Sequence, residues 1–96
     1  MWGGYVYFMA NRRHGAIYIG VTRDIAARAT QHRNGEGSDF CRRYGLKLLV
    51  YAEQHATIQE AIAREKQIKA WKRAWKVELI EQANPDWDDL YLLLNA

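Results

Sequence analysis

Apolar residues along the chain group into runs that predict three strands. Residues 4–10 and 16–21 are short apolar runs that contain tyrosine, and both suit β-strands. The polar segment "NRRHGA" between them predicts a hairpin loop that projects Arg12 and Arg13. The run "LKLLVYAE" at 46–53 predicts a third strand. Because the first run is apolar on both faces, we expect it at the centre of the sheet.

Helical patterns occupy the two segments that flank the third strand. Residues 23–33 predict a helix with Thr22 as its N-cap, which ends before the "NGEG" break. Residues 38–44 predict a short helical turn that bears Arg42 and Arg43. These two segments connect the hairpin to the third strand.

A longer helical stretch follows the third strand. Thr57 is expected to cap it, and it runs to about Gln82 with a break near Arg73. Pro85 ends it, and "WDDLYLLLNA" predicts a short terminal helix or an extended segment. The element order ββαβα predicts an α+β fold, in which helices flank a small three-stranded antiparallel sheet. Residues 1–96 are expected to form a single domain.

Length and composition exclude several classes of protein. The chain has 96 residues, 49% hydrophobic and 26% charged, which is a globular composition. No apolar run reaches the length of a membrane-spanning helix, and the N-terminus does not resemble an export signal. Cys41 is the only cysteine, so an internal disulfide and a multi-thiolate zinc site are excluded. We therefore expect a cytoplasmic protein without a membrane partner, either a monomer or a weak dimer.

The net charge of +3 is unevenly distributed. Residues 1–83 carry 14 basic and 8 acidic side chains, whereas the remaining residues carry three aspartates and no lysine or arginine. A basic body favours a polyanionic partner such as nucleic acid. Many globular domains are mildly basic, so this charge alone does not identify the partner.

The first predicted helix places an arginine and a histidine on one face. Ile25, Arg28, Ala29 and His32 are separated by three or four residues, which aligns them along the helix. Arginine offers a bidentate fork to a phosphate, and histidine offers a donor or a proton acceptor. The alternative is a surface role, in which Arg28 covers apolar surface with its stem and His32 bonds to neighbours.

The long helical stretch carries a carboxylate on its apolar stripe. Glu65 falls between the angular positions of Ala61 and Ile62 on a helical wheel. An unpaired carboxylate is costly to bury, so Glu65 needs an arginine partner or a metal ion. The apolar stripe consists of Ile58, Ala61, Ile62, Ile68, Trp75 and Leu79.

Basic side chains alternate with tryptophans farther along the same stretch. Trp71 and Trp75 are accompanied by five basic residues, Lys66, Lys69, Lys72, Arg73 and Lys76. Such a surface can follow phosphates while aromatic rings stack on bases. Tryptophans at this spacing also serve as core residues, and at least one of the two is expected to do so.

Together these features resemble the GIY-YIG nuclease family. "YVY" at 5–7 stands where the family has GIY, and "YIG" at 18–20 matches the second half of the motif. "VTRDIAARATQH" then resembles the family's helix with its arginine and histidine. "AREKQIKAWKRAWK" resembles the helix with the metal-binding glutamate. The resemblance spans nearly the whole chain, although Tyr5 replaces the glycine that the family often has.

The resemblance implies a role for each matching residue. Tyr7 and Tyr18 match the two tyrosines of the motif, and Arg28 and His32 match the catalytic arginine and the following histidine. Glu65 matches the single protein ligand of Mg²⁺ or Mn²⁺. A further catalytic asparagine occurs in some members, and here the candidate is Asn84. Residues expected to contact nucleic acid are Arg12, Arg13, Arg42, Arg43, Lys69 and Lys72.

The implied activity is metal-dependent hydrolysis of phosphodiester bonds, with DNA favoured over RNA. One alternative is a nucleic-acid-binding module that keeps the fold without cutting. Another is a protein-interaction domain that uses the apolar "WDDLYLLL" segment as its contact surface.

Overall fold

The computed structural model describes residues 3–94 and has an α+β fold. Its antiparallel sheet has the strand order β2-β1-β3. β1 (Gly4–Ala10) lies in the centre, between β2 (Ile17–Thr22) and β3 (Leu48–His55). The predicted fold class and the predicted central position of the first strand are therefore confirmed.

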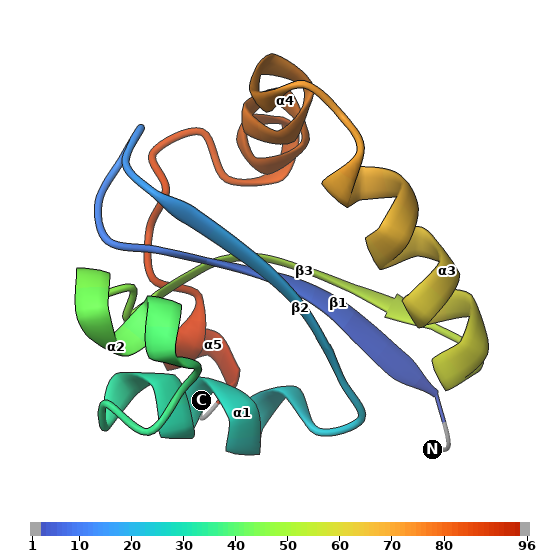
Figure 1. Cartoon of the computed structure of the whole chain (residues 1–96), viewed down its shortest axis with the longest axis horizontal. Helices are drawn as coiled ribbons and strands as arrows, with labels where there is room; N and C mark the ends of the chain where they lie inside the picture. The colour runs from blue at the N-terminus through green and yellow to red at the C-terminus, as the bar shows by residue number, and fades with distance from the viewer. Residues whose placement is uncertain (1–2, 95–96) are drawn as a thin grey trace.

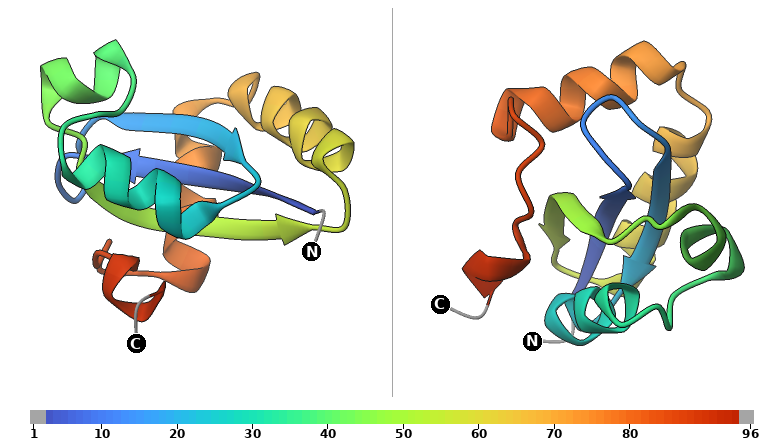
Figure 2. Two further views of the ribbon diagram at one scale, coloured as in Figure 1. Left: turned by 90° about the horizontal axis from the view of Figure 1, so that it is seen from below. Right: turned by 90° about the vertical axis from the view of Figure 1, so that its left-hand side faces the viewer.

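Helices cover both faces of the sheet (Figures 1 and 2). α1, α2 and α5 lie on one face, and α3 and α4 lie on the other. None of the helices within residues 3–94 has the length and apolar character needed to span a membrane. The helices are α1 (Ile25–Arg33), α2 (Asp39–Tyr44), α3 (Ile58–Lys69), α4 (Arg73–Ala83) and α5 (Tyr91–Leu94).

The central strand β1 contributes to a separate apolar core on each face. Val6 and Phe8 point toward α3 and α4, whereas Tyr7 and Met9 point toward α1 and α2. All four side chains are at most 1% exposed. This alternation follows from the two-residue period of a strand, and it explains why β1 is apolar at every position.

The start of the first helix differs from the prediction. α1 begins at Ile25, and its N-cap is Asp24, whose carboxylate accepts a hydrogen bond from the Ala27 amide. Thr22 is the last residue of β2, and its hydroxyl instead accepts a hydrogen bond from the Asp24 amide at 3.1 Å. Both residue types are good N-caps, so composition alone did not distinguish them.

The long helical stretch is two helices, as the predicted break near Arg73 implies. Residues 70–72 separate α3 from α4, and the chain changes direction there (Figure 1). The predicted apolar stripe is correct for Ala61 and Ile68, which are fully buried. It is wrong for Ile62 and Trp75, which are 40% and 50% exposed. Because the axis turns at the break, a wheel drawn over both helices misplaces residues after it, such as Trp75. The turn does not account for Ile62, which precedes the break.

Most of the C-terminal segment packs against the domain. Trp87 lies in the core beside α4, and Asp89 accepts a hydrogen bond from the backbone N–H of Leu49 at 3.1 Å. Only the end of the described segment presents apolar side chains to solvent, where Leu92 and Leu93 are 66% and 72% exposed.

Candidate active site

A phenol, an imidazole and a guanidinium meet on the α1 face of the sheet. The Tyr7 hydroxyl lies 3.2 Å from Nε2 of His32, and it accepts a hydrogen bond from Nη1 of Arg28 at 3.2 Å. Tyr7 and His32 are 1% and 3% exposed. The spacing of four residues in α1 brings Arg28 and His32 to the same phenol, as the helical pattern predicted.

Tyr18 joins this group from β2. Its ring lies 6.3 Å from the ring of Tyr7 and 5.8 Å from the ring of His32. Tyr7 pairs with Gly20 across the two strands, so Tyr18 is its diagonal neighbour. The structure thus brings together the four residues that the sequence proposed as catalytic, and we call them the tyrosine cluster: Tyr7, Tyr18, Arg28 and His32.

Glycine at position 20 makes room for Tyr7. A Cβ at this position would lie 2.5 Å from the Tyr7 hydroxyl oxygen. Because position 20 has no side chain, the phenol of Tyr7 can lie against β2 and reach α1. This steric requirement is a physical reason for the glycine of "YIG".

Gly20→Ala should displace the Tyr7 hydroxyl and lower the stability of the fold. Overpacking a tight site lowers the free energy of unfolding by about 1–3 kcal/mol. In a domain of this size, each kcal/mol lowers the melting temperature by roughly 4–8 °C. A thermal melt measures the change. An unchanged melting temperature would show that the phenol has space to move.

The loop after α1 closes over His32. A Cβ at Gly37 would lie 2.2 Å from the Nδ1 atom of His32, so only glycine allows this approach. Nδ1 is buried and is the one buried side-chain nitrogen or oxygen within residues 3–94 without a hydrogen-bond partner. The imidazole is therefore held by its packing and by the contact of Nε2 with Tyr7.

Burial and charge determine the protonation of the tyrosine cluster. Burial raises the pKa of Tyr7 to about 12, although the hydrogen bond from Arg28 acts in the opposite direction. Burial and the nearby Arg28 charge lower the pKa of His32 below its usual value of 6.5. At neutral pH the free protein therefore holds a protonated phenol beside a neutral imidazole.

The raised pKa of Tyr7 predicts a loss of stability at alkaline pH. An unfolded tyrosine titrates near pH 10, so between about pH 10 and 12 the folded state binds more protons than the unfolded state. The free energy of unfolding then falls as pH rises, by at most roughly 2.7 kcal/mol for two pKa units. Tyr7→Phe should reduce this fall.

Urea denaturation of both proteins at about pH 9 and about pH 11 measures the difference. The pKa of Tyr51 is also raised, chiefly by burial, but this residue is present in both proteins. Identical losses in wild type and Tyr7→Phe would contradict the assignment of the high pKa to Tyr7.

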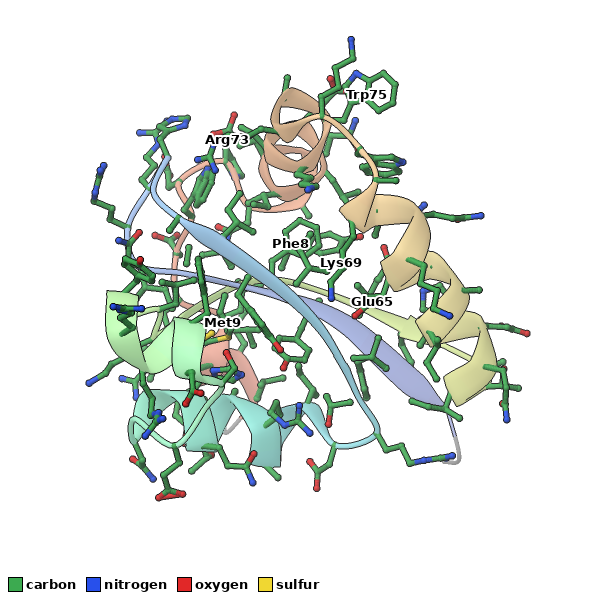
Figure 3. All side chains as sticks on the ribbon, in the orientation of Figure 1. Phe8, Met9, Glu65, Lys69, Arg73 and Trp75 are labelled. Atoms are coloured by element: carbon green, nitrogen blue, oxygen red, sulfur yellow. The ribbon has the colours of Figure 1, made fainter. Side chains whose placement is uncertain are left out.

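Glu65 approaches the sheet from the other side. It extends from α3 toward β2, together with Lys69 (Figure 3). Nζ of Lys69 lies 2.9 Å from Oε2 of Glu65, and the two side chains are 52% and 18% exposed. The predicted need for a partner is thus met by a lysine one turn along the helix. The i,i+4 spacing of Glu65 and Lys69 is visible in the sequence. The partner expected for Glu65 was nevertheless an arginine or a metal ion.

The surroundings of Glu65 are suited to a hard cation. Within residues 3–94, no three histidine, cysteine, aspartate or glutamate side chains gather closely enough to form a multi-ligand metal site. Mg²⁺ binds oxygen, keeps several of its waters and often needs only one or two carboxylates. Lys69 reaches Glu65 from a half-exposed position, so a cation can replace it without stranding a buried charge. The donor set therefore fits magnesium better than zinc.

A groove lies along the open edge of β2, between the two helical layers. Its volume is about 360 Å³. Phe40 and Lys76 line it, and neither was among the site residues proposed from the sequence. The sequence indicated Lys76 only as one of five cations on a basic helical surface, and it gave no sign of a site at Phe40. α2 and α4 meet at this edge only in the folded chain. The complete lining is Ile17, Tyr18, Ile19, Phe40, Lys69 and Lys76.

Asn84 makes its contacts away from the tyrosine cluster. It caps the C-terminal end of α4 and is 6% exposed. Its side-chain amide donates to the carbonyl oxygens of Val50 and Asp88, at 2.9 Å each, and its oxygen accepts from the Asp88 amide. These bonds fasten the turn after α4 to β3. They satisfy the amide fully, so a catalytic role would require it to leave them.

The basic side chains predicted to contact nucleic acid are exposed, but they do not form one patch. Arg12 and Arg13 lie on the hairpin loop, which Arg73 holds against α4 by donating to the carbonyl oxygens of His14 and Gly15. The ammonium of Lys72 lies 5.2 Å from the ring centroid of Trp75. The others lie on α2 (Arg42 and Arg43) and in the groove (Lys69).

Comparison with known proteins agrees with this geometry. Residues 3–78 match the GIY-YIG catalytic domain. A UPF0213 protein of Staphylococcus epidermidis is 35% identical over 71% of this chain and 83% of its own length. A UPF0213 protein of Staphylococcus saprophyticus is 35% identical over 81% of this chain and 94% of its own.

A solved relative has the same arrangement of elements. The solution structure of a UPF0213 protein from Bacillus halodurans is 26% identical, with a TM-score of 0.56, over 91% of this chain and 92% of that one. None of these names states a reaction, but the matched catalytic domain includes every residue of the tyrosine cluster and Glu65. The chain belongs to the GIY-YIG family of nucleases.

Proposed function

We propose that this protein is a divalent-metal-dependent endonuclease that hydrolyses phosphodiester bonds in DNA. The observation that carries the proposal is the hydrogen-bonded group of Tyr7, His32 and Arg28, which adjoins an open groove through Tyr18. A buried phenol between a guanidinium and a neutral imidazole has no evident structural need for both partners. It is suited to moving a proton next to a bound phosphate.

Arg28 would bind the scissile phosphate. Its guanidinium is partly exposed, and only one of its nitrogens donates to Tyr7. The remaining donors are free to pair with the non-bridging oxygens, where negative charge increases in the transition state. A positive charge fixed in place before the reaction needs little reorganisation as that charge develops.

Tyr7 would orient and activate the attacking water. With a pKa of about 12 the phenol is a poor base by itself at neutral pH. The neutral imidazole of His32 lies at 3.2 Å and can accept the phenolic proton as Tyr7 takes a proton from water. Tyr18, in the floor of the groove, would hold the water or the phosphate in line.

Glu65 would hold Mg²⁺ or Mn²⁺ through its carboxylate, with waters completing the coordination shell. When bound, the metal would neutralise charge on the phosphate and on the leaving oxygen. Lys69, which now pairs with Glu65, would be released toward the groove that it lines.

A cleavage screen with purified protein tests the proposal. Labelled single-stranded, nicked, branched and continuous duplex DNA, and the matching RNA strands, are incubated with Mg²⁺ or with excess EDTA. We expect cleavage of at least one DNA substrate with Mg²⁺ and none with EDTA. Equal cleavage in EDTA would contradict the metal assignment. Cleavage of RNA alone would contradict the choice of DNA.

A further inference from the structure

The groove at the edge of β2 has walls of different chemistry. Its floor is the β2 segment with Tyr18 at its centre, and no strand covers it, because β2 is an edge strand. Phe40 of α2 forms one wall, and Lys69 and Lys76 form the other. In Figure 1, α2 and α3 lie on opposite sides of β2, so these walls come from separate layers.

The aromatic wall is unusually open for a phenylalanine. Phe40 is 43% exposed, and its ring is 4.9 Å from that of Tyr44, which is 53% exposed and does not line the groove. Exposing a large apolar ring to water is unfavourable unless a ligand or partner covers it. Aromatic rings at the border of a positively charged groove are how proteins stack unpaired bases.

The opposite wall is cationic, and its two lysines are held by local contacts. Nζ of Lys69 contacts Glu65, and Nζ of Lys76 donates to the carbonyl oxygen of Lys69 at 3.3 Å. Two ammonium groups therefore stand across the groove from an exposed phenyl ring. This pairing of charge and ring matches the two halves of a nucleotide, one anionic and one flat and aromatic.

We propose that this groove binds an unpaired nucleotide of the substrate, with its base stacked on Phe40 and its phosphate beside Lys69 and Lys76. A volume of about 360 Å³ is at the small end of ligand sites, which span roughly 300–1,000 Å³. The groove is therefore of a size to take one nucleotide. The inference rests on the proposed function and narrows its substrate to DNA with a single-stranded segment.

Tyr18 links the groove to the chemistry. It forms part of the groove floor, and its ring also approaches those of Tyr7 and His32. A nucleotide in the groove would thus place an adjacent phosphodiester near the tyrosine cluster. Phe40 would select the substrate and would not take part in the reaction.

Binding in EDTA tests the groove without cleavage. Fluorescence anisotropy is measured with a fluorescein-labelled single-stranded oligodeoxynucleotide and with the duplex of the same sequence. Wild type should bind the single strand more tightly. Phe40→Ala should weaken single-strand binding by about tenfold, which is typical of a lost stacking ring, and should leave duplex binding nearly unchanged. Tyr44→Ala is the matched control and should behave as wild type.

The salt dependence tests the cationic wall. Removing one phosphate contact to a single strand should reduce the slope of log K against log salt by about 0.7. Lys76→Gln should show this reduction, whereas Lys66→Gln, an exposed change on α3 outside the groove, should not. Circular dichroism confirms that all variants fold.

The outcomes separate this inference from the nuclease proposal. Equal single-strand affinity of Phe40→Ala and wild type would overturn the inference, as would equal losses in Phe40→Ala and Tyr44→Ala. Equal slope changes in Lys76→Gln and Lys66→Gln would also overturn it, because they indicate diffuse attraction. If the binding pattern holds but no substrate is cleaved with Mg²⁺, the nuclease proposal fails and the groove assignment stands.

Discussion

Replacing Arg28 with lysine should reduce cleavage by about 100- to 1,000-fold, the range seen when one donor to a transition-state oxyanion is lost. Lysine keeps the positive charge but not the planar fork, so it cannot bind the phosphate and contact the Tyr7 hydroxyl at the same time. The fold should remain, because Arg28 is only partly buried. Single-turnover cleavage rates at saturating protein measure the loss.

Arg33→Lys is the matched control for this change. Arg33 lies on the same helix, but it pairs with Asp89 and lies over the ring of Tyr91 at 4.6 Å. That variant should cleave at close to the wild-type rate. Near-normal cleavage by Arg28→Lys, or equal losses of cleavage in both variants, would mean that Arg28 has a structural role on the surface of α1 and no role in the reaction.

Glu65→Gln should abolish metal-dependent cleavage while leaving nucleic-acid binding and the fold intact. The amide keeps the shape of the carboxylate but loses the charge that binds Mg²⁺. The only ion pair that Glu65 makes within residues 3–94 is with the half-exposed Lys69, and such pairs contribute about 0–1 kcal/mol. In metal-free buffer the variant should therefore melt at the same temperature as wild type or higher.

Two measurements test the prediction for Glu65→Gln. Thermal melts in EDTA report the stability of the fold, and electron paramagnetic resonance reports the binding of Mn²⁺. Glu60→Gln, an exposed change in the first turn of α3, is the control and should bind Mn²⁺ like wild type. If Glu65 instead belonged to a buried ion pair, Glu65→Gln would lower the free energy of unfolding by about 3–5 kcal/mol. A large fall in melting temperature with cleavage retained would remove the support for Glu65 as a metal ligand.

The fold and the tyrosine cluster were predictable because their signals are local. An apolar pattern on both faces of residues 4–10 indicates a central strand, and the spacing of Arg28 and His32 is one helical turn. Adjacent antiparallel strands then bring Tyr7 and Tyr18 together. The period of a strand or a helix and the order of elements explain why these side chains meet. The choice of Tyr7 and Tyr18 as site residues came from the resemblance to the GIY-YIG family.

The groove was not predictable because its parts come from four separate elements, β2, α2, α3 and α4. In the sequence, Phe40 is one apolar residue of a predicted short helical turn, and Lys76 is one of several basic residues on the long helical stretch. Their alignment with Tyr18 depends on the turn between α3 and α4 and on the loop that closes over His32. The same turn explains the exposure of Trp75, which the helical wheel placed in the core.

The most direct test of the central claim is a time course of DNA cleavage by purified wild-type protein with Mg²⁺ and with excess EDTA. Arg28→Lys, purified in parallel, controls for contaminating nucleases. The account predicts that wild type with Mg²⁺ forms product, that EDTA stops product formation, and that Arg28→Lys is slower by about two orders of magnitude or more. Equal rates in all three reactions, or no product from any DNA substrate, would contradict it.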